Sequence, residues 1–246
     1  MSSLEKTFAV IEVVVSEQEL GLPFSTIVDR TGLPKASVHR ILKGLTAMGY
    51  LTFNGETKRY QGSLKLAAIG GEVMANFDLR NHLHPQLLRL HQETHHTCNI
   101  GIVNNDHGIF IDKIESQDYG IRLISGIGKS FPLHSTALGK VLLAYNSAVA
   151  EKILRRKLKA YTNKTITKTE LLKKELSTIQ KQGYAIDNEE VTRGIICVAA
   201  PVFSVSEEVV CAISIAFPFY IKNDRGIKPE IDAIKRHAAM ISGSFR

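Results

Sequence analysis

Residues Phe24–Tyr60 constrain the fold of this chain more than any other stretch of its sequence. Apolar residues at helical spacing predict a short helix, residues 31–33 supply a tight break, and a second helix is predicted to start near residues 34–35. Gly49 suits the position just after a helix, and the Asn54-Gly55 dipeptide favours the turn of a strand hairpin. This order predicts a winged helix-turn-helix, whose second helix fits the DNA major groove.

Helical patterns flank this motif on both sides. Residues 4–15 predict a first helix with Phe8, Ile11 and Val15 facing inward. Residues 64–78 predict a linker helix, and Gly70-Gly71 is the natural place for it to bend. We therefore expect a winged helix-turn-helix domain over residues 1–63, the linker helix over 64–78, and a second domain over 79–246.

Within the second domain the hydrophobic period changes repeatedly between helix and strand. Runs rich in β-branched residues predict strands at 98–103, 109–114, 121–124, 195–203 and 209–217. Amphipathic patterns predict helices at 79–94, 135–145, 151–158, 170–182 and 231–241. Strands and helices mixed in this irregular order predict an α+β domain with one largely antiparallel sheet.

The net charge of +7 on 246 residues does not by itself indicate a nucleic-acid partner. Residues 1–64 hold seven Lys or Arg against six Asp or Glu, whereas residues 151–181 hold ten against three. The basic excess thus lies away from the predicted recognition helix, where a run of charge is typical of a solvated helical surface. The helix-turn-helix motif, and not the overall charge, is therefore what predicts DNA binding.

Compartment and membrane contact are predicted from what the chain lacks. No apolar run approaches the roughly 18 residues that a membrane helix needs, and the first six residues lack a signal-peptide pattern. Cys98, Cys197 and Cys211 are odd in number and have no CxxC spacing, which indicates reduced thiols. We expect a cytoplasmic protein without membrane contact or cofactor.

Two blocks of the second domain carry a resemblance to a known family. They read GKSFPLHSTALGKVLLA at 128–144 and GYAIDNEE at 183–190, the latter leading to GIICVAAPV at 194–202. With the winged helix, these blocks resemble the IclR family of bacterial transcriptional regulators over essentially the whole chain. The resemblance implies a GAF-like effector-binding domain, a homodimer or dimer of dimers on double-stranded operator DNA, and a small organic, sugar or aromatic acid as effector. It also implies a regulator, more often a repressor, and not an enzyme.

The predicted DNA-contacting residues lie on the second helix of the motif and on its wing. Arg and Lys suit guanine edges or phosphates, while Ser and His can contact either. The candidates are Lys35, Ser37, His39, Arg40 and Lys43 on the helix, and Lys58 and Arg59 on the wing. The alternative is a winged helix that binds proteins, with these residues merely solvated.

The predicted effector site begins at the helix after Pro132. Its first turn exposes backbone amides, and the helix dipole favours an anion there; the resemblance places Ala137 and Leu138 at this point. Leu138 is also expected to reshape the wall of the site.

The resemblance also places Asp187, Cys197 and Ser214 in the pocket. Asp187 could accept a hydrogen bond from a ligand hydroxyl, and Ser214 could bridge to the ligand. Alternatives stay open, because Cys197 is equally typical of strand packing and Asp187-Asn188 of a turn.

Arg122 and Arg193 are two further candidates for the effector site. Either guanidinium could clamp a carboxylate, phosphate or sulfonate, Arg193 at the pocket mouth. The alternative for Arg193 is a solvated surface arginine.

Histidines gather between His82 and His96, and His91 with His95 has the i, i+4 spacing of a metal-binding helix face. No HExxH arrangement accompanies them, so a metal site is not predicted, although the cluster leaves that question open. An enzyme built on Cys197 and His134 is a third alternative, without a P-loop or dinucleotide fingerprint to support it.

Overall fold

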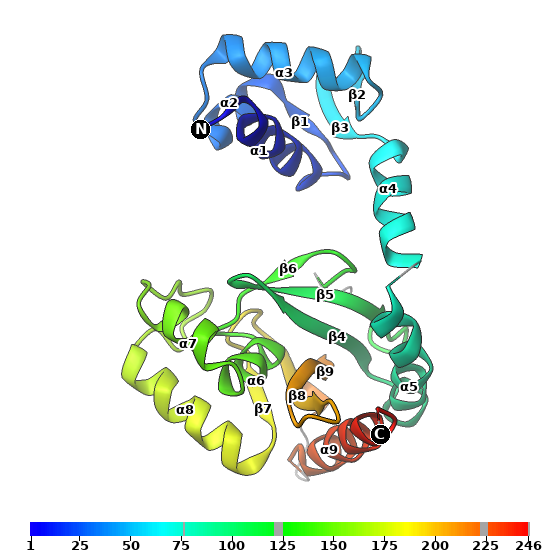
Figure 1. The fold of residues 1–246 in the computed structure, drawn as a ribbon, viewed down its shortest axis with the longest axis vertical. Coiled ribbons are helices and arrows are strands. Elements are labelled where there is room, and N and C mark those ends of the chain that lie inside the picture. The colour runs from blue at the N-terminus through cyan, green and yellow to red at the C-terminus, as the bar shows by residue number, and fades with distance from the viewer. Residues whose placement is uncertain (76, 121–124, 222–225, 246) are drawn as a thin grey trace. The chain divides into compact units, whose positions relative to one another are not determined.

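The computed structural model of the chain describes residues 1–75, 77–120, 125–221 and 226–245. The chain divides into two compact units, Met1–Phe77 and Asp78–Arg246 (Figure 1). Among the described residues no helix is both long and apolar enough to cross a membrane. The predicted strand at 121–124 lies outside the described residues.

The described residues of the N-terminal unit form four helices and a small sheet. The helices are α1 (Ser3–Val15), α2 (Phe24–Thr31), α3 (Lys35–Ala47) and α4 (Leu64–Ala75). Ser2 and Glu5 form a reciprocal capping box at the start of α1. Gly32 ends α2 at φ 64°, and Gly49 follows α3 at φ 76°. Both glycines take the left-handed conformation that lets the chain leave a helix sharply.

The wing is a three-stranded antiparallel sheet in the order β1-β3-β2, built from β1 (Leu22–Pro23), β2 (Leu51–Asn54) and β3 (Arg59–Gly62). The hairpin was predicted around Asn54-Gly55, but Asn54 pairs with Arg59, so the loop has four residues. The Asn54 side chain closes this loop by accepting from the Glu56 and Thr57 amides at 2.9 and 3.0 Å. The asparagine thus caps a longer turn instead of forming a two-residue one.

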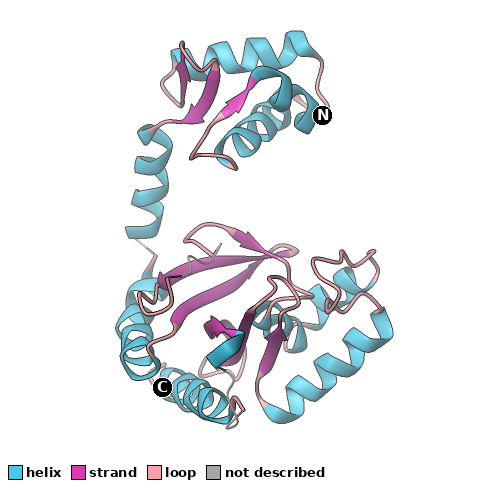
Figure 2. Cartoon of the chain, turned by 180° about the vertical axis from the view of Figure 1, so that it is seen from behind, coloured by secondary structure: helices cyan, strands magenta, loops and turns pink. Residues whose placement is uncertain are grey.

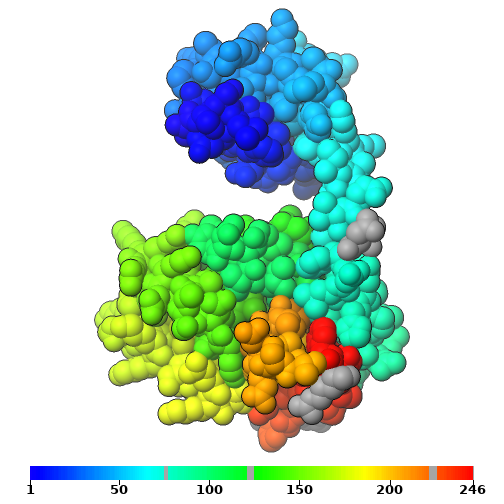
Figure 3. All heavy atoms as spheres, viewed as in Figure 1, coloured from blue at the N-terminus to red at the C-terminus, as the bar shows by residue number. Residues whose placement is uncertain are grey.

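The inward face of α1 differs in part from the predicted one, since Ile11 packs against the core as predicted. Val10 and Val14 are buried, whereas Phe8 and Val15 are 54 % and 40 % exposed. The N-terminal core packs Val10 and Val14 against Ile27 of α2 and residues of α3. Figure 3 shows α1, in the darkest blue, at the surface of this unit. The helix is apolar on two sides, so its period alone did not identify the side that packs inside.

The described residues of the C-terminal unit form one six-stranded antiparallel sheet in the order β6-β5-β4-β9-β8-β7. Figure 2 shows its strands in magenta among the helices. Its strands are β4 (Thr97–Asn104), β5 (His107–Ile114), β6 (Ser130–Phe131), β7 (Ala185–Asn188), β8 (Ile195–Phe203) and β9 (Val209–Pro218). The sequence did not predict β6 and β7, which are short edge strands. With helices packed on this sheet, the fold is α+β as predicted.

Helices cover both faces of this sheet. One face packs against α5 (Asp78–Thr94) and α9 (Lys228–Gly243), and the other against α6 (Ala137–Ala144). Next to α6 lie α7 (Ser147–Leu154) and α8 (Thr169–Gln182), and a 3-10 turn spans Phe219–Ile221. All eight residues of α6 are buried, so this helix forms the centre of one core.

Candidate functional site

The outer surface of α3 carries the predicted DNA-contacting side chains. Lys35, His39, Arg40 and Lys43 are exposed, while Val38, Leu42 and Leu45 on the opposite side are buried. Ser37 is half-buried, at the edge of the exposed face. Apart from the edge contact of the His39 ring with Phe24, these side chains have no partner among the described residues. They are available to a partner in solution.

The two predicted wing residues have different surroundings. Lys58 is exposed in the hairpin loop, at φ 56°. The Arg59 guanidinium donates to the Gly21 carbonyl at 2.8 Å, and Arg59 pairs with Pro23 in the sheet. This bond gives Arg59 a part in holding β1 on the wing, a role the sequence did not indicate.

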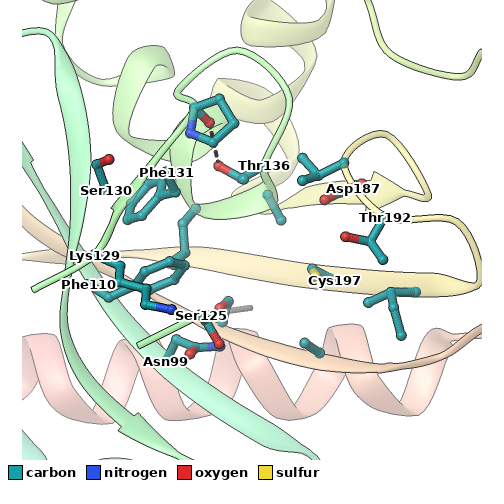
Figure 4. A pocket seen from close by; sticks show the side chains of 17 residues that line it. Asn99, Phe110, Ser125, Lys129, Ser130, Phe131, Thr136, Asp187, Thr192 and Cys197 are labelled. Atoms are coloured by element: carbon teal, nitrogen blue, oxygen red, sulfur yellow. Dashed lines mark hydrogen bonds between the residues drawn. The ribbon is translucent and has the colours of Figure 1, made fainter. Parts of the chain in front are cut away.

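The second candidate site is a cavity of about 190 Å³ in the C-terminal unit, between α6 and the sheet (Figure 4). Residues of the six strands β4 to β9, the start of α6 and three loops contribute to its wall. They are Asn99, Phe110, Ser125, Lys129, Ser130, Phe131, Pro132, Thr136, Ala137, Leu138, Asp187, Val191, Thr192, Ile195, Cys197, Ser214 and Ala216. The size suits a small molecule, below the usual range for drug-sized ligands.

The strand register explains why residues of β4, β7, β8 and β9 meet in the cavity. Asp187 pairs with Cys197, which pairs with Ala216 on the next strand. Asn99 pairs with Ser214 in the adjacent row. Cross-strand partners point to the same face of a sheet, so these five side chains share the face that α6 covers.

The first turn of α6 meets the cavity with two unused amides. Thr136 caps the helix by accepting from the Gly139 amide at 3.0 Å. The Ala137 and Leu138 amides have no acceptor among the described residues, and both residues line the cavity. Such amides, aided by the helix dipole, bind an anionic or carbonyl oxygen. The structure thus brings together Ala137, Leu138 and the residues of β7, β8 and β9 that the family resemblance assigned to the effector site.

Phe131 forms a fixed wall because two glycines make room for its ring. A Cβ atom on Gly108 would lie 2.0 Å from the ring, and one on Gly101 would lie 2.7 Å from it. Real Cβ atoms do not approach so closely, so any other residue at these positions would displace the ring.

Asp187 is held by a buried network behind the cavity. Its Oδ1 accepts from the Glu190 amide at 2.6 Å. The Glu190 carboxylate binds Lys140 Nζ at 2.6 Å, and the same ammonium donates to the Ile186 carbonyl at 2.6 Å. Glu175 completes the set at 2.9 Å from Lys140 Nζ. Burial raises the pKa of the Asp187 carboxyl to about 7, despite the lowering effect of the Glu190 amide.

Cys197 and His134 do not form a catalytic pair. Burial raises the pKa of the Cys197 thiol well above its usual value, and the neighbouring Asp187 raises it further. The His134 Nε2 atom lies 2.9 Å from the Lys159 carbonyl and faces that partner. A neutral thiol beside an acid suits a wall of the cavity and not a nucleophile.

Of the two predicted arginine clamps, only Arg193 can be placed in the structure. Arg122 lies outside the described residues. Arg193 is exposed and does not line the cavity, although its neighbour Thr192 does. The cavity wall instead contains Lys129, which was not among the predicted site residues. Within a Gly-Lys-Ser turn, no local pattern distinguishes this lysine from a solvated one.

The histidines between His82 and His96 point to separate partners. His84 Nδ1 lies 2.6 Å from Asp112, and His91 Nδ1 lies 2.8 Å from the His96 carbonyl. His96 contacts the Tyr119 hydroxyl at 2.7 Å, and His82 contacts Ser244. Over the described ranges no three His, Cys, Asp or Glu side chains are grouped to hold a metal ion.

Comparisons with known proteins point in the same direction as the two sites. Residues 3–55 match the IclR helix-turn-helix domain, and residues 71–243 match the bacterial transcriptional regulator IclR C-terminal family. The chain is 36 % identical to the HTH-type transcriptional regulator KdgR of Escherichia coli over 247 residues, covering 100 % of this chain and 93 % of that protein. It is 31 % identical to the transcriptional repressor IclR of Escherichia coli over 216 residues, covering 86 % and 78 % of the two chains.

Among solved structures, an IclR homolog of Microbacterium hydrocarbonoxydans in complex with 4-hydroxybenzoate superposes with a TM-score of 0.80. The two sequences are 20 % identical, and the match covers 100 % of this chain and 99 % of that one. At this identity the likeness concerns the fold.

Proposed function

Since this chain belongs to the IclR family of bacterial transcriptional regulators, a family of DNA-binding proteins and not of enzymes, we propose that it represses a catabolic operon and responds to a small organic acid. The observation that carries the proposal is the cavity under α6, with two free amides and the polar side chains of Asp187 and Ser214. This combination suits a small molecule bearing both acceptor oxygens and hydroxyl groups.

DNA recognition in this proposal is the task of α3. Lys35, His39, Arg40 and Lys43 enter the major groove, Ser37 approaches from the edge, and Lys58 on the wing binds a phosphate. Arg59 holds the wing in place for that contact. Because the N-terminal unit is nearly neutral, affinity depends on these few side chains and on two copies of α3 binding a palindromic operator, as a homodimer or dimer of dimers in the cytoplasm.

The effector half of the proposal uses the cavity. The Ala137 and Leu138 amides donate to an oxygen atom of the effector, Asp187 and Ser214 exchange hydrogen bonds with its polar groups, and Cys197 packs against it. Binding changes the separation of the two recognition helices, and a coupling of about 1–3 kcal/mol is enough to change operator occupancy markedly.

A mobility-shift assay with the DNA upstream of the protein's own gene tests the first half. Arg40→Ala is expected to weaken binding roughly 5- to 100-fold, because a good base contact contributes about 1–3 kcal/mol. Arg155→Ala, at an arginine 82 % exposed in the C-terminal unit, is the matched control and should leave affinity unchanged. Equal effects of the two substitutions, or no shift with any segment of neighbouring DNA, would refute sequence-specific reading by α3.

A further inference from the structure

The described wall of the cavity contains two ionisable side chains, and they lie at opposite ends. Figure 4 shows Asp187 beside Thr192 at one end and Lys129, Ser125 and Asn99 toward the other. The α6 amides are neutral donors, so Lys129 is the cation that this wall presents to a ligand. Ionisable groups at opposite ends of a site favour one orientation of an asymmetric ligand.

The backbone of Lys129 is held in place while its ammonium is free. Its carbonyl accepts from the Phe110 amide at 3.0 Å, and its amide donates to the Gly126 carbonyl at 2.9 Å. The aliphatic part of the side chain lies along Gly126, where a Cβ atom would be 3.4 Å from Lys129 Cδ. No hydrogen bond or ion pair joins Lys129 Nζ to any described residue. Lys129 is exposed and has no partner in the described part of the chain, so its ammonium can receive an anion.

Two buried oxygen atoms at the same end lack partners. Asn99 is 3 % exposed, and neither its Oδ1 nor the Ser125 Oγ has a hydrogen-bond partner in the described chain. Lys113, the register partner of Asn99, donates to the Ser125 carbonyl at 2.9 Å, which places both residues at one end of the cavity. Buried polar atoms without partners cost stability, and they point to a ligand that supplies the missing bonds.

We propose that Lys129, Ser125 and Asn99 form the subsite that receives the acid group of the effector together with a hydroxyl group next to it. The ammonium and the serine hydroxyl donate to the carboxylate. The Asn99 Oδ1 atom needs a donor, which a carboxylate cannot supply and an adjacent hydroxyl can. The inference rests on the proposed function and narrows the effector to hydroxylated carboxylic acids, with Asp187 binding their far end.

Three six-carbon probes separate charge from hydroxyl groups in the test. Gluconate carries both, glucitol carries only hydroxyls, and hexanoate carries only the charge. Isothermal titration calorimetry of the full chain, without DNA, is expected to show gluconate binding more tightly than either of the others.

Two substitutions then dissect the preference. Lys129→Met should weaken gluconate binding roughly 10- to 100-fold, to the level of glucitol, because a hydrogen bond to a charged group is lost. Asn99→Leu should lower the affinity for gluconate toward the affinity for hexanoate, because the acceptor for the adjacent hydroxyl group is lost. Arg193→Met is the matched control, because Arg193 is a cation next to a lining residue but is not itself in the cavity wall. This substitution should leave the affinity for gluconate unchanged.

The proposal is overturned if the wild-type protein binds gluconate no more tightly than glucitol, or binds neither. It is overturned as well if Lys129→Met still binds gluconate more tightly than glucitol. The same holds if Arg193→Met abolishes the preference for gluconate over glucitol and Lys129→Met does not. Unliganded melting temperatures check that each variant folds. A mobility-shift titration with gluconate separates this proposal from the proposed function. If bound gluconate left the operator affinity unchanged, regulation by this ligand would be refuted, but the subsite would not.

Discussion

Asp187 shows how one buried carboxyl can influence both stability and ligand binding. It is 4 % exposed, and its Oδ1 is occupied by the Glu190 amide. Burial dominates over that hydrogen bond and raises the pKa of the carboxyl to about 7. Near neutral pH the group is therefore present in both protonation states. It can accept a hydrogen bond from a ligand hydroxyl when charged and donate one when neutral.

The raised pKa of Asp187 predicts a pH-dependent stability that Asp187→Asn should remove. The folded chain keeps this proton up to about pH 7, whereas the unfolded chain loses it near the ordinary pKa of 3.8. Folding therefore binds a proton between these values, so the free energy of unfolding falls as pH rises through that window. Asparagine still accepts from the Glu190 amide and does not titrate. Relative to wild type, the variant should gain about 2–3 kcal/mol between pH 5 and pH 8, as measured by urea unfolding.

The control for this prediction is a carboxyl with the opposite shift. Hydrogen bonds from His237 and Arg236 lower the pKa of Glu93, so Glu93→Gln should lose relative stability as pH rises through the acid range. A stability difference between Asp187→Asn and wild type that stays constant from pH 5 to pH 8 would contradict the raised pKa.

At the scale of one element, α4 carries two adjacent glycines in its interior. Gly70 and Gly71 lie within Leu64–Ala75, and a Cβ atom at either position would meet no other atom within 4 Å. Glycine in a helix interior costs about 0.5–1 kcal/mol relative to alanine. Since no steric demand requires these glycines, we infer that they keep α4 easy to bend.

Replacing both glycines with alanine should therefore weaken the transmission of effector binding. Operator affinity of the unliganded double variant Gly70→Ala/Gly71→Ala should stay within about twofold of wild type, while the ratio of affinities with and without bound acid should move toward one. Fluorescence anisotropy on operator DNA measures both quantities. Gly243→Ala, at another helical glycine with open space around it, is the control. A double variant with the full wild-type ratio would exclude bending at these glycines from the coupling.

The elements also show which parts of the structure the sequence could predict. The helix-turn-helix and the main strands were predicted because their periods and terminal glycines are local signals. The hairpin loop and the face of α1 were not, since Asn54 is compatible with two kinds of turn and α1 is apolar on two sides. Lys129 was missed because its place in the cavity depends on Phe110 and Gly126 fixing its backbone. Such a contact between separate segments leaves no mark in the local pattern.

At the scale of the whole molecule, the N-terminal unit has exposed apolar side chains that the unit itself does not bury. On α1, Leu4 and Phe8 are 66 % and 54 % exposed, and Val15 follows at helical spacing. On α4, Ile69 and Val73 are exposed one turn apart. Exposed apolar stripes of this kind are typical of surfaces that another chain covers. In a homodimer the same stripe of each copy meets around a twofold axis, which would also place two α3 helices for a palindromic operator.

Phe8→Glu should consequently impair binding to a complete operator more than binding to one of its halves. A charge in the centre of an apolar interface costs several kcal/mol, and two N-terminal units that no longer associate lose the advantage of binding together. We expect affinity for the complete site to fall at least tenfold and affinity for a half-site to change less than twofold, as measured by fluorescence anisotropy on footprinted DNA. Leu171→Glu, at an exposed leucine of α8, is the matched control and should affect neither. If Phe8→Glu kept the wild-type preference for the complete operator, α1 would be excluded as the contact between copies, and the paired α3 helices would have to be held by the C-terminal units alone.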